Sequence, residues 1–120
     1  MITNQLKLLF IMLIVISLIS CTSPASKNYD DFASCLDSNG ATFYGAFWCS
    51  HCQNQKAMFG SSADILPYIE CSTPNRKTEQ ACIDKEIKSY PTWVFADGTR
   101  VVGEMKLETL SQKTGCTLPD

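Results

Sequence analysis

The sequence is poor in three features that would each point to a different class of protein. His51 is its single histidine, so a metal site built from several imidazoles is not expected. Lys and Arg number 10 against 12 Asp and Glu, without a basic run, so nucleic acid is not an expected partner. The longest apolar run is shorter than the roughly 20 residues that a membrane-spanning helix needs. What remains is a small, mildly acidic chain of 120 residues.

That apolar run lies at the N-terminus and has the form of an export signal. It follows Lys7 and extends from Leu8 to Ile19, about a dozen residues, which is the length of a secretory signal peptide. The run ends in LISC, which resembles a bacterial lipobox with Cys21 as the lipidated first residue of the mature chain. Plain cleavage near residues 23–26 and an uncleaved N-terminal anchor are the alternatives. All three interpretations place the folded part outside the cytoplasm, and the first predicts a lipoprotein anchored to a membrane in the bacterial periplasm.

The sequence therefore predicts three parts. Residues 1–20 are a signal peptide of the lipoprotein type, residues 21–28 are a short polar tether, and residues 29–118 form one domain. A domain of about 90 residues closes one small core and is near the size at which covalent crosslinks help. Seven cysteines are present, so six remain besides Cys21, an even number in a compartment that permits disulfides.

The pattern of residues 29–118 predicts helices alternating with strands. We expect helices over residues 29–38, 53–59, 79–87 and 107–114, and strands over residues 41–47, 67–71, 92–95 and 100–102. The last two strands are joined by Asp97-Gly98, a strong hairpin signal. A β-α-β unit followed by an antiparallel hairpin and a covering helix predicts an α/β fold with a mixed four-stranded sheet flanked by helices. Phe43, Phe47, Trp93 and Phe95 are expected in its core.

Cys49 and Cys52 form a Cys-X-X-Cys motif at the junction between a predicted strand and a predicted helix. The unpaired amide groups and the dipole at a helix N-terminus lower the pKa of a thiol placed there, and the thiolate is the form that attacks disulfides. We therefore predict a redox pair in which Cys49 is the nucleophile and Cys52 the resolving cysteine. His51 lies between them and adds a donor or a positive charge, which favours the reduced form and makes the disulfide a stronger oxidant.

The same motif has other uses, which leave alternatives open. Haem attachment needs a histidine after the second cysteine, and this chain has Gln53 there. A periplasmic copper(I) chaperone could use Cys49 and Cys52 with His51 or Met58, and an adaptor protein could carry an inert pair. The redox interpretation predicts neither a metal nor a cofactor.

Four separated segments carry a resemblance to a known family. They read FYGAFWCSHCQNQK at 43–56, YIEC at 68–71, YPTW at 90–93 and TGC at 114–116. Together they resemble the thioredoxin-like domain that is fused to, or partnered with, bacterial homologues of vitamin K epoxide reductase. The resemblance covers nearly all of residues 30–116 and implies a thioredoxin-like fold without an inserted domain. It also implies that Pro91 is cis and faces the motif, and that the backbone of Tyr90 pairs with a substrate strand. Trp48, directly before the nucleophile, could shape the same groove.

The resemblance implies an exported thiol-disulfide oxidoreductase that forms or exchanges disulfides in exported proteins. A quinone-linked membrane protein of the vitamin K epoxide reductase or DsbB type would then recharge it. Two departures leave the direction of electron flow open, so a periplasmic reductase or electron relay is an alternative. Thioredoxin carries a buried carboxylate six positions before its first active-site cysteine, where this chain has Phe43, and Ser50 replaces the commonest proline or glycine of the motif.

The remaining cysteines are expected to form structural disulfides. Cys71 and Cys82 lie in a region where the resembling family also has a cysteine pair, and closing that loop would restrict the unfolded chain by roughly 3 kcal/mol. A second redox pair is the alternative. Cys35 and Cys116 would then pair by elimination, although four cysteines allow three connectivities. Lys56 and Glu70 could assist proton transfer near Cys52, or they could be solvated surface charges.

Overall fold

The computed structural model describes residues 2–16 and 27–120. Helix α1 (Ile2–Ile16) falls within the predicted signal peptide, and no helix of the described residues is both long and apolar enough to cross a membrane. The predicted lipidation site Cys21, the alternative cleavage region and most of the predicted tether lie outside the described residues.

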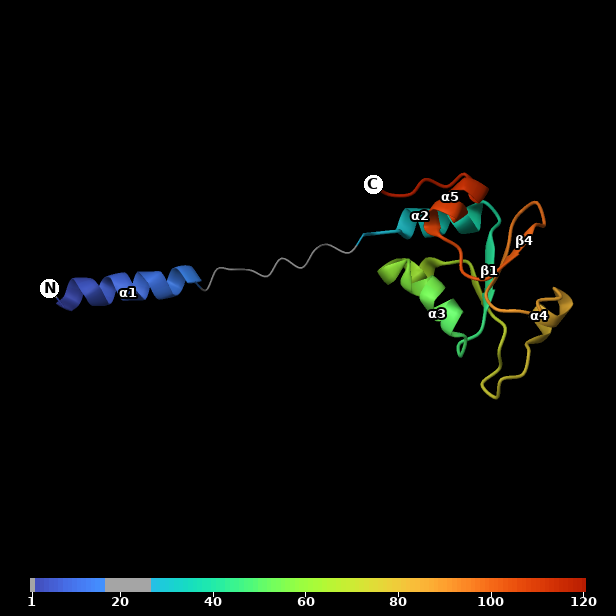
Figure 1. Cartoon of the computed structure of the whole chain (residues 1–120), viewed down its shortest axis with the longest axis horizontal. Helices are drawn as coiled ribbons and strands as arrows, with labels where there is room; N and C mark the ends of the chain where they lie inside the picture. The colour runs from blue at the N-terminus through green and yellow to red at the C-terminus, as the bar shows by residue number, and fades with distance from the viewer. Residues whose placement is uncertain (1, 17–26) are drawn as a thin grey trace.

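A mixed four-stranded sheet forms the centre of the domain, in agreement with the predicted α/β fold (Figure 1). Its strands are β1 (Thr42–Gly45), β2 (Tyr68–Glu70), β3 (Thr92–Val94) and β4 (Arg100–Val102), in the spatial order β2-β1-β3-β4. Strand β1 is parallel to β2 and antiparallel to β3, and β3 pairs antiparallel with β4. The predicted hairpin is present, and Gly98 in its turn has a φ of +81°, a backbone conformation that suits glycine.

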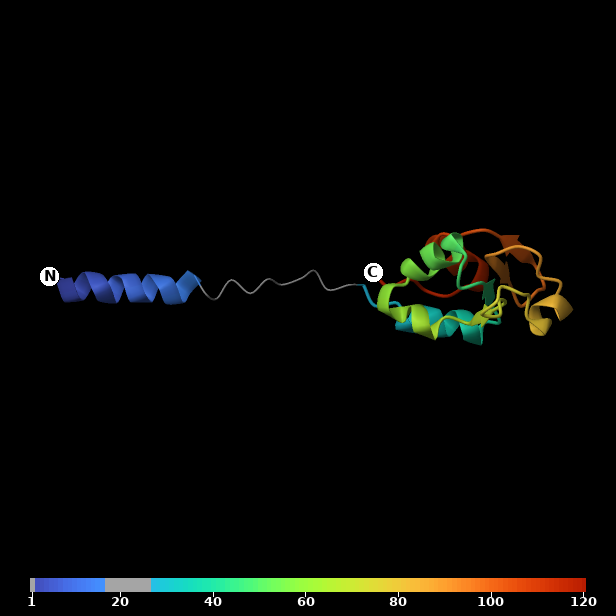
Figure 2. The ribbon, with the colours of Figure 1, turned by 90° about the horizontal axis from the view of Figure 1, so that it is seen from below.

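Four α-helices accompany the sheet in residues 27–120. They are α2 (Asp30–Ser38), α3 (Ser50–Ala57), α4 (Gln80–Asp84) and α5 (Leu107–Thr114), with a 3-10 helix η1 (Gly60–Ile65) after α3. Figure 2 shows α2 on one side of the sheet and α3 with α5 on the other. The helix predicted over residues 79–87 is shorter than expected. It ends at Asp84 because Glu86 adopts a φ of 54°, which turns the chain and lets the Ile87 amide close onto the Cys82 carbonyl at 2.9 Å.

Aromatic side chains fill the core between the sheet and its helices. Phe43 stacks on Trp93 with ring centroids 4.9 Å apart, and Phe95 continues the stack at 6.4 Å from Trp93. The prediction was wrong for Phe47, which is 49% exposed. The reason is that β1 ends at Gly45, so Phe47 lies in the turn before α3 and no longer follows the alternation of the strand.

Gln55 is a fully buried polar side chain on α3, and it joins three parts of the fold. Its Oε1 accepts hydrogen bonds from Trp93 Nε1 at 3.1 Å and from the backbone amide of Met105 at 2.7 Å. Its Nε2 donates to the Met105 carbonyl at 3.0 Å. Through these hydrogen bonds the buried amide connects α3 to β3 and to the loop between β4 and α5.

Two disulfides connect distant parts of the domain. Cys35 of α2 is bonded to Cys116 after α5, 81 residues away, and Cys71 after β2 is bonded to Cys82 of α4, 11 residues away. Both Cys71 and Cys82 are 0% exposed. Because an attacking thiolate needs access to a sulfur, this burial favours a structural role for the pair over a second redox site.

We expect Gln55→Leu to lower the free energy of unfolding by on the order of 3 kcal/mol, because leucine fills the space but leaves the buried Trp93 and Met105 donors unpaired. Urea unfolding of the full chain followed by far-UV circular dichroism measures this loss. Gln80→Leu is the matched control, since Gln80 is exposed on α4. Equal stability of the two variants would contradict the structural role of Gln55.

Removing a disulfide should cost more stability when it closes a longer loop, and the cost should grow with the logarithm of the loop length. On the chain-entropy model, Cys71→Ala with Cys82→Ala should cost about 3 kcal/mol, and Cys35→Ala with Cys116→Ala about 4.5 kcal/mol. Urea midpoints of the two double variants would test this order. If the Cys71–Cys82 pair is structural, its double variant should also keep the reactivity of Cys49 unchanged at temperatures where it remains folded.

Candidate active site

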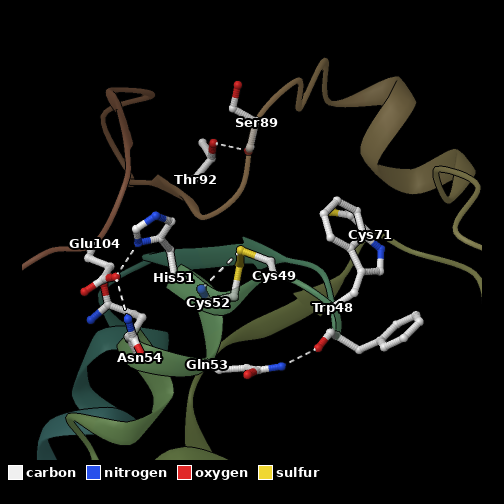
Figure 3. The surroundings of a disulfide bond; sticks show 12 residues. Trp48, Cys49, His51, Cys52, Gln53, Asn54, Cys71, Ser89, Thr92 and Glu104 are labelled. Carbon is white, nitrogen blue, oxygen red and sulfur yellow. Dashed lines mark hydrogen bonds and ion pairs between the residues drawn. A yellow bond between two sulfur atoms is a disulfide. The ribbon is translucent and has the colours of Figure 1, made fainter.

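The Cys-X-X-Cys motif lies at the N-terminus of α3. Cys49 is the N-cap residue of the helix, with φ −82° and ψ 113°, and its Sγ accepts a hydrogen bond from the Cys52 amide at 3.1 Å. The two cysteines are joined in a disulfide with their Cα atoms 5.2 Å apart (Figure 3). When the pair is reduced, the same amide and the helix dipole stabilise a thiolate on Cys49.

The two sulfurs differ in accessibility. Cys49 is 7% exposed and Cys52 is 1% exposed, so an incoming sulfur reaches Cys49 first. Gly45 at the end of β1 makes this packing possible, because a Cβ at that position would lie 2.8 Å from the Tyr68 ring and 3.0 Å from Cys52 Sγ. The absence of a side chain there lets Cys52 pack directly against the backbone of the sheet.

A groove of about 390 Å³ runs beside the disulfide and brings together most of the predicted site residues. Residues 48–51 line one side and residues 88–90 line the other. The Tyr90–Pro91 peptide bond is cis, the isomer that the resemblance implies, and Pro91 itself is fully buried behind Tyr90. The loop is held by Thr92, whose hydroxyl donates to the Ser89 carbonyl at 2.7 Å (Figure 3).

Trp48 forms an exposed aromatic wall at one end of this groove. It is 42% exposed, its ring meets that of Tyr90 edge-on at 5.9 Å, and its Nε1 donates to Ser72 Oγ at 2.8 Å. Phe47, next to it, is also exposed. The Arg76 guanidinium carbon lies 5.9 Å from the centroid of the Trp48 ring. The tryptophan is therefore held in place while part of its ring remains exposed.

Glu70 is more than a solvated surface charge, because it holds the backbone on both sides of Trp48's contact with Ser72 through hydrogen bonds. Its Oε1 accepts from the amides of Phe47 at 3.1 Å and Ser72 at 2.9 Å, and its Oε2 accepts from the Tyr68 hydroxyl at 2.7 Å. Burial, and then the hydrogen bond to Glu70, raise the pKa of the Tyr68 phenol, so it stays a donor. Lys56 Nζ lies 3.4 Å from the centroid of the Tyr68 ring. The suggested part of Lys56 and Glu70 in proton transfer stays a prediction.

His51 has a partner that the sequence did not reveal. Its Nδ1 lies 2.6 Å from Oε1 of Glu104, which also accepts from Asn54 Nδ2 at 3.2 Å (Figure 3). The hydrogen bonds from His51 and then from Asn54 hold the pKa of the Glu104 carboxyl below its usual range. Glu104 lies 53 residues after His51, in the loop between β4 and α5, and no motif marks it. The sequence carries no signal for this contact, because the position of Glu104 depends on the tertiary hydrogen bond between the neighbouring Met105 and Gln55 of α3.

The described residues offer no cluster of side chains that would ligate a metal ion. Among residues 2–16 and 27–120, no group of three or more His, Cys, Asp or Glu is arranged to hold a metal ion.

The sequence is similar to a known thiol-disulfide oxidoreductase. No protein-family model matches the sequence. The chain is 44% identical over 88 residues to the thiol-disulfide oxidoreductase LTO1 of Arabidopsis thaliana. The alignment covers 69% of this chain and 23% of the plant protein, so the chain corresponds to less than a quarter of that relative's length.

Proposed function

We propose that this protein is a thiol-disulfide oxidoreductase of thioredoxin-like fold, with Cys49 and Cys52 as its working pair. The observation that carries the proposal is the position of Cys49, which caps helix α3, is bonded to Cys52 and opens onto a groove. The mixed sheet with helices on both sides and the similarity to a plant thiol-disulfide oxidoreductase support it.

The exchange follows from the geometry of the pair. In the oxidising direction, a substrate thiolate attacks Cys49 Sγ, the Cys49–Cys52 bond breaks, and Cys52 leaves as a thiolate that takes up a proton. A second substrate thiolate then attacks the substrate sulfur of the mixed disulfide, which releases the substrate disulfide and the Cys49 thiolate. Two electrons thus pass from the substrate dithiol to the protein pair. The substrate thiols lose their two protons to the solvent, Cys52 takes up one proton, and Cys49 stays a thiolate. Reduction of a substrate is the same sequence in reverse.

The groove is suited to an extended segment of substrate. Such a segment would pass between Trp48 and the residues before Pro91, with its cysteine at Cys49 and its backbone beside Tyr90. The exposed faces of Phe47 and Trp48 favour apolar or unfolded chain segments over a single small molecule. Exported proteins that still carry free cysteines have this character.

The N-terminal pattern and the resemblance support a proposal for the location and the partner of this protein. We propose export with a lipid anchor at Cys21, which would hold the domain at a periplasmic membrane surface. Each oxidising turnover leaves the pair reduced, so an oxidant must take two electrons from Cys49 and Cys52. A quinone-linked membrane protein similar to vitamin K epoxide reductase or DsbB would supply this step, and anchoring would keep the two proteins close.

Trapping variants test the exchange itself. We expect Cys52→Ser to accumulate a stable mixed disulfide with a reduced, unfolded substrate after oxidation with a small disulfide, because Cys52 can no longer resolve the bond. Cys49→Ser should accumulate little. Non-reducing electrophoresis with mass spectrometry detects the adduct. A chain that forms no adduct at Cys49 but retains stoichiometric copper(I) would instead support the chaperone alternative.

The reduction potential decides the direction of electron flow. The amide of Cys52 and the neighbouring His51 both favour a thiolate on Cys49, so we expect a value of roughly −120 to −180 mV, in the range of disulfide donors. Equilibration of the full chain in glutathione buffers, followed by its tryptophan fluorescence, gives this value, because Trp48 lies directly before Cys49 and should respond to the state of the disulfide. A potential near roughly −270 mV would rule out the donor direction and indicate a reductase or an electron relay.

A further inference from the structure

The loop between β4 and α5 is fastened to one face of α3. Gln55 makes two hydrogen bonds to the backbone of Met105, which is itself 4% exposed. The neighbouring residue, Glu104, reaches back along the same helix to Asn54 and His51. Residues 51, 54 and 55 are spaced by three and four positions, so they lie on one side of the helix. The buried contact at Gln55 therefore determines where the Glu104 carboxylate is placed.

The contact between Glu104 and His51 specifies which ring nitrogen carries the proton. An ionised carboxylate can only accept hydrogen bonds, so His51 Nδ1 must be the donor at 2.6 Å. Asn54 donates to the same oxygen and keeps the carboxylate in place. The side chain of Glu104 is 27% exposed and that of His51 is 70% exposed, so Glu104 is the more buried of the two partners. Figure 3 shows Nδ1 turned toward Glu104, with the other ring nitrogen on the far side of the ring.

This arrangement matters because His51 lines the groove together with Cys49. Once Glu104 holds Nδ1, Nε2 is the nitrogen left for the groove. Neutral His51 can accept a proton there from an incoming thiol, and charged His51 can donate to a thiolate on Cys49. Lys88 and Tyr90 border the same groove from the opposite side, and Lys88 brings a positive charge to it. Without Glu104, the exposed ring would be free to rotate and to change tautomer.

We propose that Glu104 is a positioning residue that acts through His51 to favour the reduced form of the Cys49–Cys52 pair. The inference rests on the proposed thiol-disulfide exchange and names a residue that tunes it. The direction in which Glu104 shifts the redox equilibrium distinguishes this role from a direct effect of its charge. A carboxylate acting on its own would repel a nearby thiolate and favour the disulfide, whereas a carboxylate that holds a histidine donor in place favours the thiolate.

The redox equilibrium of the full chain with glutathione tests the proposal. We expect Glu104→Ala and His51→Ala each to shift the equilibrium toward the disulfide by about threefold to tenfold, where tenfold corresponds to about 30 mV. Combining the two substitutions should add nothing beyond His51→Ala, because Glu104 acts through the ring. Glu108→Ala, which removes an exposed carboxylate from the start of α5, should leave the equilibrium unchanged.

Two outcomes would overturn the inference while leaving the proposed function intact. One is a shift toward the dithiol in Glu104→Ala. The other is an effect of Glu104→Ala that persists in the His51→Ala background, since both results indicate that charge alone acts. If the wild-type pair does not exchange with glutathione, the proposed function itself is contradicted and the inference with it.

Nitrogen-15 chemical shifts of His51 give a readout that does not depend on redox activity. Wild-type protein at neutral pH should show protonated Nδ1, and Glu104→Ala should lose that preference. Glu104→Gln keeps an acceptor oxygen without the charge, so it should retain the tautomer and restore most of the redox equilibrium. A wild-type ring protonated mainly at Nε2, or a Gln variant that behaves like the Ala variant in both measurements, would contradict a positioning role.

Discussion

The buried amide of Gln55 is the interaction on which the arrangement of this site depends. It connects α3, which carries the disulfide, with β3 and with the loop after β4. Burial removes the hydrogen bonds that the Gln55 amide would make to water. The three hydrogen bonds to Trp93 and Met105 replace them, so burying this side chain is favourable only when all of them form. This requirement sets the position of α3 relative to the sheet, and with it the direction in which Cys49 opens.

The site is assembled from three segments that are distant in sequence. The turn after β1 and the start of α3 supply Trp48 and the two cysteines, the loop before β3 supplies Tyr90, and the loop after β4 supplies Glu104. Each segment is fastened separately: the first by Glu70, the second by Thr92 and the third by Gln55. The segments around the groove are thus each hydrogen-bonded to the rest of the fold, while the aromatic rings of Phe47 and Trp48 remain exposed.

Much of the fold was predictable because its signals are local. The alternation of residues in the strands, the Asp97-Gly98 turn and Gly115 after α5 each indicate their element within a few residues of sequence. The failures also have local causes. An aromatic run continues past Gly45 and predicts that Phe47 belongs to the strand, whereas it is exposed. The helical pattern of apolar residues continues to Ile87 and predicts a longer α4, whereas the positive φ of Glu86 turns the chain first. The end of α4 carries no glycine or proline that would mark it. Gly45 does mark the end of β1, because glycine is unfavourable in strands, but the aromatic residues after it favour a longer strand.

By itself, the sequence determined the α/β class, the four strands and the position of the Cys-X-X-Cys motif at a helix start, since these follow from periodicity and from neighbouring residues. Only the tertiary structure decided that Cys35 bonds to Cys116, that Glu70 holds the Trp48 turn, and that Glu104 meets His51. These contacts join residues 81, 23 and 53 positions apart. Contacts between residues so far apart in the chain leave no periodic pattern in the sequence. Their partners become neighbours only when the sheet and helices pack around one core.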